Sequence, residues 1–577
     1  MHAGPAGSGQ RAAGSGQRAA GSGQRAAGSG QRAAGSKSVL FAVRSAVALH
    51  RLLDVLPVFA GDPRIRRHFT LVPGSAFAAE ALGGLDGAGA RLVPWDDAVR
   101  TSYDLVLAAS PKGDLDRLRG PLVLLPHGAG FGKSLPGEGS ADSASGLDAT
   151  FLMRDGVPLA DLHALAHGDQ VAALTARCPA AAPRAAVVGD PTLDRLLASR
   201  GRRERYRAAL GTGGRRLVVL TSTWGPESLL ARHPGLPARL VAELPQDAYQ
   251  VALVLHPNDH SETGAQDLAE WLAPAVAGGL LVPRPHEEWA AVLVAADAVL
   301  TDHGSTALYA AALDRPLLAV CDGGAELLPG SPMARLLTAV PTFRSPDDLD
   351  ATVARHRPGS VRALADGAFA ERGRALEWLR AAVYGRLGLS PPAAPAEPRL
   401  LPPPRCTAPA PVAWAVRTTV DGTTVTVERH PPGGEGPLGH LAVEEDAASV
   451  RHARSAAVLF RRARPASGDT AWTAGGWTAH ALARYPGRRT AAVLLAADRC
   501  VLRRPGGALL SVRIAAREEA GRVHRPDPAA VVSAVHAWLA RSAAEVTWPV
   551  TLICRIGGRS YRARLAPATE DEAALEV

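Results

Sequence analysis

Two histidines stand directly after apolar runs that read as buried strands, where a side chain could take up or give a proton. His127 follows one run and precedes Gly128 and Gly130, whereas His256 follows another. Open α/β sheets bind their ligands at the carboxyl ends of the strands. We therefore predict that His127 is a general base in a cleft kept open by the two glycines, and that His256 neutralises phosphate oxygens. The alternative for His127 is a structural histidine in a glycine-rich turn.

A second polar segment, 301–306, lies between another predicted strand and a helix. Gly304 allows a ligand to come close, and Ser305 or Thr306 can cap the helix so that its free N–H groups face the cleft. A helix start of this kind suits a diphosphate, although a plain N-cap has the same sequence. The predicted diphosphate site comprises His256, His303, Gly304, Ser305, Thr306 and Thr223, and the predicted substrate cleft adds Gly128, Gly130 and Asp302.

The segment 127–134 ends like a phosphate-binding P-loop, with Lys133 followed by Ser134. That motif requires glycine where His127 stands, and no acidic partner for magnesium is evident. A P-loop is therefore the weaker interpretation. The five cysteines are scattered without CxxC spacing, which indicates a reducing compartment rather than a disulfide framework or a zinc site. We predict no metal and no cofactor.

Apolar runs that alternate with helical stretches must position these residues. The runs are 39–43, 69–72, 91–93, 105–108, 122–125 and 185–188, then 217–220, 251–255, 280–282, 298–300 and 316–320. Near-continuous apolar strands between helices are typical of parallel sheets covered on both faces. The predicted fold class is α/β, with two Rossmann-like lobes and an additional C-terminal α+β module.

Composition divides the chain into five parts. Residues 1–37 form a tail with four copies of Gly-Ser-Gly-Gln-Arg-Ala-Ala, too poor in apolar side chains to fold. The two lobes occupy 38–198 and 199–389. A linker with nine prolines follows at 390–413, and the α+β module occupies 414–577.

Charge and hydropathy exclude several classes of protein. The net charge is +9, but the tail carries five basic side chains and no acid, and subtracting these leaves +4, which does not predict a nucleic-acid partner. No segment approaches the roughly 18 apolar residues of a membrane helix. The predicted location is the cytoplasm. The last module has 22 basic and 16 acidic side chains, an excess that would suit peripheral contact with the inner face of the plasma membrane or with an anionic polymer.

The order of the motifs resembles a known family. These are His127-Gly128, Gly189-x-Pro191-x-x-Asp194, Thr221-x-Thr223-Trp224, His256-Pro257, and Asp302-x-Gly304-Ser305 followed by Asp314-Arg315-Pro316. Over roughly residues 38–385 this series resembles the CDP-glycerol glycerophosphotransferases of teichoic-acid synthesis. It is similar to an actinobacterial branch sometimes labelled a translation initiation factor, a label that the incomplete GTPase loop does not support.

The resemblance implies a GT-B-type fold in which the first lobe binds a hydroxyl acceptor and the second a CDP-linked donor. It places the general base on His127, and the diphosphate contacts on His256, Ser305 and Thr306. The acceptor would be a cell-envelope polymer or a lipid-linked molecule.

Three positions depart from the family's pattern. Thr192 stands where arginine is common, Gly225 where a basic residue is frequent, and His303 where an aromatic residue is usual. The loss of two phosphate-facing charges keeps two alternatives open. One is a glycosyltransferase that uses a nucleotide sugar, and the other is a non-catalytic nucleotide-binding protein that retains the cleft.

Overall fold

The computed structural model describes residues 35–577 except 76–88, 135–143, 410, 434–438, 464–469, 486, 488–489 and 543–545. The predicted repeat tail lies outside the described residues apart from its last three. Lys37, the last of these, belongs to the folded part, because it begins the first strand and its Nζ donates a hydrogen bond to Asp104 Oδ1 at 3.2 Å. Residues Lys37–Val577 form one compact unit.

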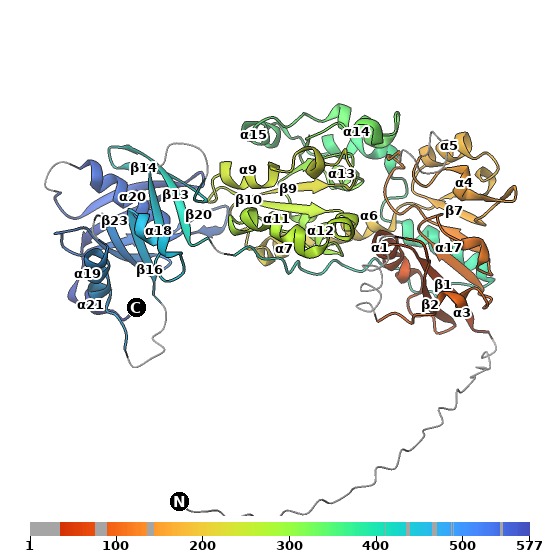
Figure 1. The fold of residues 1–577 in the computed structure, drawn as a ribbon, viewed down its shortest axis with the longest axis horizontal. Helices are drawn as coiled ribbons and strands as arrows, with labels where there is room; N and C mark the ends of the chain where they lie inside the picture. Colours follow the sequence, from red (N-terminus) through yellow and green to blue (C-terminus); the bar gives the residue numbers. More distant parts are fainter. Residues whose placement is uncertain are drawn as a thin grey trace, which may run out of the picture. The chain divides into compact units, whose positions relative to one another are not determined.

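The first lobe is a six-stranded parallel sheet with the order β2-β1-β3-β4-β7-β8. Figure 1 labels three of its strands, β1, β2 and β7. Its strands are β1 (Lys37–Val43), β2 (Ile65–Leu71), β3 (Leu105–Ala108), β4 (Leu122–Leu124), β7 (Leu162–Leu165) and β8 (Ala185–Val187). Except for the edge strand β2, which carries Arg66, Arg67 and His68, the strands are mostly apolar on both faces, so both faces must be covered. One face shares a core with α1 (Ala46–Val55) and α17 (Ala375–Leu387), and the other with α5 (Gly168–Arg177).

Helix α17 lies within the range 199–389 predicted for the second lobe, yet its apolar face packs into the core of the first. Asp194, in the helix α6 (Pro191–Ser199), holds the start of α17 by accepting hydrogen bonds from Gly373 N at 2.6 Å and Ala375 N at 2.7 Å. The chain therefore returns to the first lobe after building the second, and the two lobes are not consecutive segments of sequence.

The second lobe contains a four-stranded parallel sheet with the order β10-β9-β11-β12. Its strands are β9 (Arg216–Ser222), β10 (Tyr249–Leu255), β11 (Ala298–Thr301) and β12 (Leu317–Ala319). One face packs on α7 (Arg203–Ala209), α12 (Glu288–Ala295) and α13 (Thr306–Ala312), and the other on α9 (Leu236–Glu243) and α11 (Ala265–Ala277). The two parallel sheets confirm the predicted pair of Rossmann-like lobes.

Three sequence-based predictions of strands need correction. The runs 91–93 and 280–282 each make a single bridge to a sheet, through Leu92 and Leu281, and neither run forms a strand. Strand β7 was not predicted, because His163 interrupts a short apolar run with a polar residue.

The proline-rich segment 390–413 is more than a spacer. Within its described residues it forms no helix, but Leu401 is buried in the core of the second lobe. Its N–H donates to Ser199 Oγ at 2.9 Å, and its carbonyl accepts from Tyr206 Oη at 2.8 Å. The predicted linker therefore runs along the second lobe and is fixed to it.

The last module closes into a barrel with the strand order β13-β14-β22-β23-β19-β18-β17-β16-β15. The strands are β13 (Ala413–Asp421), β14 (Thr424–His430), β15 (His440–Glu444), β16 (Val458–Arg462), β17 (Thr490–Ala496), β18 (Arg499–Arg503), β19 (Leu510–Ile514), β22 (Val550–Ile556) and β23 (Arg559–Pro567). Helix α20 (Pro528–Arg541) contacts six of these strands, β13, β14, β16, β17, β18 and β22. Ten of its fourteen residues are buried, so the helix fills the barrel. The α+β class is as predicted.

Arg429 fastens the barrel to the second lobe. Its buried guanidinium donates to both carboxylate oxygens of Asp247, at 2.9 and 2.6 Å, and to Asp527 of the barrel at 2.7 Å. Trp414 lies 4.6 Å from the same guanidinium. Asp247 stands just before β10, so the barrel attaches at the amino ends of the second-lobe strands.

Candidate active site between the lobes

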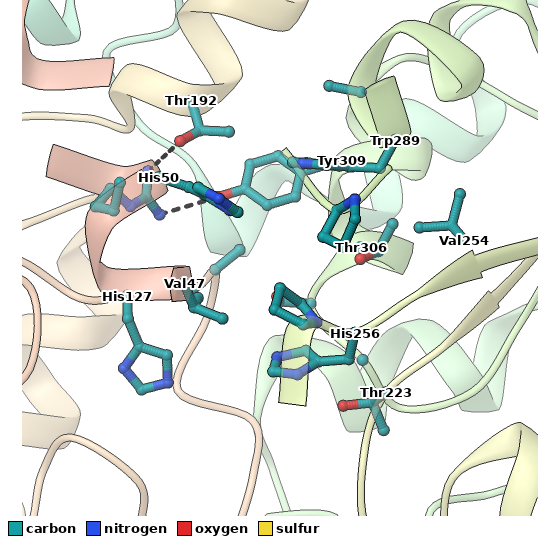
Figure 2. A pocket seen from close by; sticks show the side chains of 18 of the residues that line it. Val47, His50, His127, Thr192, Thr223, Val254, His256, Trp289, Thr306 and Tyr309 are labelled. Carbon is teal, nitrogen blue, oxygen red and sulfur yellow. Dashed lines mark hydrogen bonds between the residues drawn. The ribbon is translucent and has the colours of Figure 1, made fainter. Parts of the chain in front are cut away.

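A cavity of about 190 Å³ lies between the lobes at the carboxyl ends of their strands. Figure 2 shows His127 on the first-lobe side of this pocket, and His256, Thr223 and Thr306 on the second-lobe side. In the second lobe these residues follow β9, β10 and β11, where the strand order reverses. Such a reversal opens the crevice in which α/β sheets bind ligands. The structure thus brings His127 into one cavity with His256, which stands 129 positions later in the sequence.

His127 follows β4 on a loop and faces the cavity, whose walls surround it. The surrounding protein still lowers its pKa to about 4, because burial disfavours the charged imidazolium and because Lys112, Arg51 and Lys133 add positive charge nearby. His127 is therefore neutral at pH 7. A neutral imidazole can accept a proton from a bound hydroxyl group.

His256 has its tautomer fixed by a local hydrogen bond. Its Nδ1 accepts from the backbone N–H of Asn258 at 3.1 Å, which leaves the proton on Nε2. Burial, followed by the charge of Lys133 and His127, lowers its pKa to about 3. His256 therefore stays neutral and offers Nε2–H as a hydrogen-bond donor to a ligand in the cavity, toward which Figure 2 shows the ring pointing.

Asp302 organises the second-lobe wall without lining the cavity. Its fully buried carboxylate accepts from Thr223 N and Leu229 N at 2.8 Å each, and from Gly304 N at 2.9 Å. Since a Cβ on Gly304 would lie 3.0 Å from Thr223 Cβ, this glycine permits the tight packing of the wall. The prediction that Asp302 faces substrate is wrong, because its oxygens are used to hold three loop N–H groups.

His303 is one of the residues that line the cavity, although its side chain packs into the second-lobe wall. Its imidazole is fully buried, and Nε2 lies 3.0 Å from Glu326 Oε2. Burial lowers its pKa, so the ring is neutral. The same carboxylate pairs with Lys133 Nζ at 3.1 Å, and Lys133 also lies 4.2 Å over the Trp224 ring. Lys133 also lines the cavity, so an ammonium group lies close to the predicted diphosphate contact at His303.

The P-loop interpretation of 127–134 does not fit the backbone. Lys133 and Ser134 form bridges to Leu327 and Ala144, whereas a P-loop lysine begins a helix. Ser134 N also donates to Glu326 O at 2.7 Å. The loop from the first lobe is thus joined to a loop of the second by backbone hydrogen bonds.

The glycines of this loop serve the contact between the lobes. A Cβ on Gly128 would lie 3.1 Å from Ser305 Oγ, one on Gly130 would lie 2.9 Å from Leu308 Cδ1, and one on Gly132 would lie 2.9 Å from Met333 Cβ. Gly130 does not line the cavity. The prediction that this glycine opens the backbone to substrate is wrong, since it allows the loop to pack on α13.

Gly130→Ala is expected to destabilise the contact between the lobes. The residue has φ +85°, which strains any side chain by about 1–3 kcal/mol, and the new methyl group would also meet Leu308. Gly156→Ala is the matched control, because Gly156 has φ +77° but nothing within 4 Å of its added Cβ. Urea unfolding should show a larger loss for Gly130→Ala than for the control. Equal losses would mean that the contact with Leu308 contributes nothing.

Arg51 is a cavity residue that the sequence analysis missed. It lies on α1 of the first lobe and makes a buried bidentate ion pair with Asp190 at 2.7 and 2.8 Å. Its guanidinium also donates to Thr192 Oγ1 and to Tyr309 Oη of the second lobe, at 2.9 Å each (Figure 2). Arg51 thus places a guanidinium beside Thr192, which lies on another helix, α6.

Two further histidines meet across the cavity. The rings of His50, on α1, and His286, before α12, stack with centroids 4.5 Å apart. Burial and the neighbouring His286 lower the pKa of His50 to about 3, so the pair is held by ring contact and not by charge. Among the described residues, no group of three or more His, Cys, Asp or Glu side chains is arranged to hold a metal ion.

Comparison with known proteins gives only distant likenesses. No protein-family model and no curated protein matches the chain. The wall teichoic acid polymerase TagF is similar over 61% of this chain and 89% of its own, with 13% identity and a TM-score of 0.43. UDP-GlcNAc 2-epimerase from Neisseria meningitidis is similar over 60% and 100%, with 14% identity and a TM-score of 0.41. Anabaena Alr3699/HepE bound to UDP-glucose is similar over 60% and 99%, with 18% identity and a TM-score of 0.37. These values assign neither a family nor an activity.

Proposed function

We propose that the chain is a transferase that moves glycerol phosphate, or a related group, from a CDP-linked donor to a hydroxyl acceptor in cell-envelope polymer synthesis. His127 removes the proton from the acceptor hydroxyl, whose oxygen attacks the β-phosphorus of the donor. The bond from that phosphorus to the bridging oxygen breaks, and CMP leaves with the electron pair. The product is a phosphodiester, and the proton remains on His127.

The observation that supports this proposal is the placement of His127 and His256 on opposite lobes of one cavity. A general base contributes roughly 10²–10⁴-fold in rate when it lies within hydrogen-bond reach of the hydroxyl group. A donor held on the second lobe would present its diphosphate to His256 Nε2–H and to the hydroxyl groups of Ser305 and Thr306, which line the same wall. The order of motifs along the chain supports the same assignment.

Positive charge for the diphosphate comes from Arg51 and Lys133. Both line the cavity, and both are held in place by carboxylates, Asp190 for Arg51 and Glu326 for Lys133. Fixed cations stabilise charge as it develops on the leaving group. Thr192 and Gly225 stand where the resembled family often has basic residues, and Arg51 and Lys133 supply positive charge in their place. This replacement favours an active enzyme over a non-catalytic binding protein.

The nucleotide released identifies the reaction. We expect the full chain, given CDP-glycerol and a glycerol phosphate acceptor, to release CMP, measured by chromatography of the nucleotides. Release of a nucleoside diphosphate from a nucleotide sugar would instead show a glycosyltransferase. Binding without release of either product would show a binding protein.

We also expect CDP-glycerol to bind more tightly than GTP, because the 127–134 loop is bridged to the second lobe and offers no phosphate cradle. Isothermal titration of the full chain measures both affinities. Tighter binding of GTP that requires magnesium and is lost in Lys133→Ala would contradict the proposal and restore the P-loop interpretation.

A further inference from the structure

A row of arginines crosses the outer surface of the barrel. Arg499 on β18 pairs in register with Arg513 on β19, and Arg513 pairs with Arg564 on β23. Arg562 is two residues before Arg564 and therefore lies on the same face, as does Arg555 on β22, opposite Ser560. Arg499 is half-buried, and the other four are exposed. We call these five residues the arginine face.

The arginine face costs free energy in the protein alone. Residues directly opposite on neighbouring strands have Cβ atoms about 4.5–5.5 Å apart, and like charges at that spacing repel each other. No outward position of β18, β19, β22 or β23 carries Asp or Glu. Arg513 has Glu572 Oε1 at 3.2 Å, but within the described part of the chain the other four make no ion pair. A partner with its own row of negative charges would remove the repulsion.

We propose that the arginine face binds a linear phosphodiester polymer, which on the proposed function is the growing acceptor or product chain. A guanidinium group can donate two parallel hydrogen bonds to the oxygens of one phosphate, and a row of arginines can therefore bind successive phosphates. On this proposal the barrel binds the polymer, and the two lobes carry out the transfer reaction.

A polymer fits this face better than a membrane does. Peripheral membrane binding combines basic residues with apolar side chains that enter the bilayer. The exposed large apolar residues of the described module are Val450, Trp472, Val523 and Leu575, and none of them lies on the four strands. No described helix is long and apolar enough to cross a bilayer.

The test compares two triple variants of the full chain. Arg499→Gln, Arg562→Gln and Arg564→Gln together remove three charges of the face and leave Arg513 with Glu572. Arg67→Gln, Arg119→Gln and Arg205→Gln remove three exposed charges from the lobes, none of which makes an ion pair within the described chain. The probe is fluorescently labelled poly(glycerol phosphate), and its anisotropy reports affinity between about 50 and 200 mM salt.

We expect wild type and the lobe variant to bind with similar salt dependence. In the face variant the slope of log K against log salt should fall by about 2, since each lost phosphate contact contributes about 0.7. Its affinity at the lowest salt should fall more than tenfold. Equal losses in both variants would overturn the proposal, since only net charge would then matter. Stronger binding to phosphatidylglycerol vesicles or to single-stranded DNA of equal charge would also overturn it.

Failure of this inference can be told apart from failure of the proposed function. CMP release onto a monomeric acceptor does not require the polymer face, so the face variant should retain it. If wild type binds polymer through the arginines but releases no CMP, the proposed function fails and the polymer site stands.

Discussion

His127→Ala is expected to lower kcat by about 10²–10⁴-fold while the affinity for the donor changes little. The imidazole stands on the first-lobe side of the cavity, whereas the donor contacts are expected on the second-lobe wall. CMP release gives kcat, and titration with CDP-glycerol gives the affinity. Loss of binding with unchanged kcat would show that His127 holds the donor and is not the base.

His256→Ala is the matched variant on the opposite wall. Because it removes the Nε2–H donor to the diphosphate, it should weaken donor binding by roughly ten- to a hundredfold, the loss of one hydrogen bond to a charged group of about 1.5–3 kcal/mol. The same loss is expected for the double variant Ser305→Ala, Thr306→Ala. If the His127 and His256 variants showed the same changes in kcat and in donor affinity, the two walls of the cavity would not have the separate roles proposed.

The pH profile checks the same assignment. His127 must be neutral to accept a proton, and its pKa is lowered to about 4, so kcat/KM should be constant near neutrality and fall as the pH drops through about 4. A bound diphosphate favours the imidazolium and raises this pKa, so the acidic limb of kcat should lie at higher pH than that of kcat/KM. If the fall of kcat/KM at acidic pH persisted in a residually active His127→Gln variant, it would report the protonation of a group other than His127.

Arg51→Met is expected to destabilise the protein by about 3–5 kcal/mol. Removing one partner of a buried ion pair leaves the other charge without compensation, and the side chains of Arg51 and Asp190 are only 3% and 2% exposed. Arg100→Ala is the control, because its pair with Asp97 is 70% and 60% exposed and should matter by less than about 1 kcal/mol. Urea unfolding followed by tryptophan fluorescence measures both.

A second change separates charge from packing. Adding Asp190→Asn to Arg51→Met removes the uncompensated carboxylate but keeps a side-chain oxygen to cap α6, where Asp190 Oδ1 now accepts from Leu193 N at 2.8 Å. The double variant should recover part of the lost stability. No recovery would mean that the hydrogen bonds to Thr192 and Tyr309 carry the effect.

The sequence was sufficient to predict the lobes and the placement of His127 and His256 at strand ends, because strand ends can be read from apolar runs. Arg51 could not be found in this way. It contacts Asp190 across 139 positions of sequence, through packing that no local pattern reveals. A signal was present, since Arg51 lies on the apolar stripe of α1 with Ala48 and Val55, where a charge needs a buried partner.

The roles of Gly130 and Asp302 were predicted less well for a related reason. The local sequence around a glycine or an acidic residue in a strand-end loop is the same whether that residue faces a ligand or a neighbouring loop. Only the packing of the two lobes decides between these, as the approach of Gly130 to Leu308 shows. The barrel escaped prediction because β14 and β22 pair in parallel, Thr424 with Ile553, far apart in the sequence.

This pairing also constrains how the last module can fold during synthesis. The strands β13 to β19 leave the ribosome before α20, which fills their interior, and before β22 and β23, which seal it. Until α20 has been made, their apolar inner faces have no core to enter. Closure then has to join segments separated by most of the module, and contacts of such long range form slowly. The nascent barrel therefore exposes apolar surface until these segments arrive, and a truncation that removes β23 should leave an aggregating product.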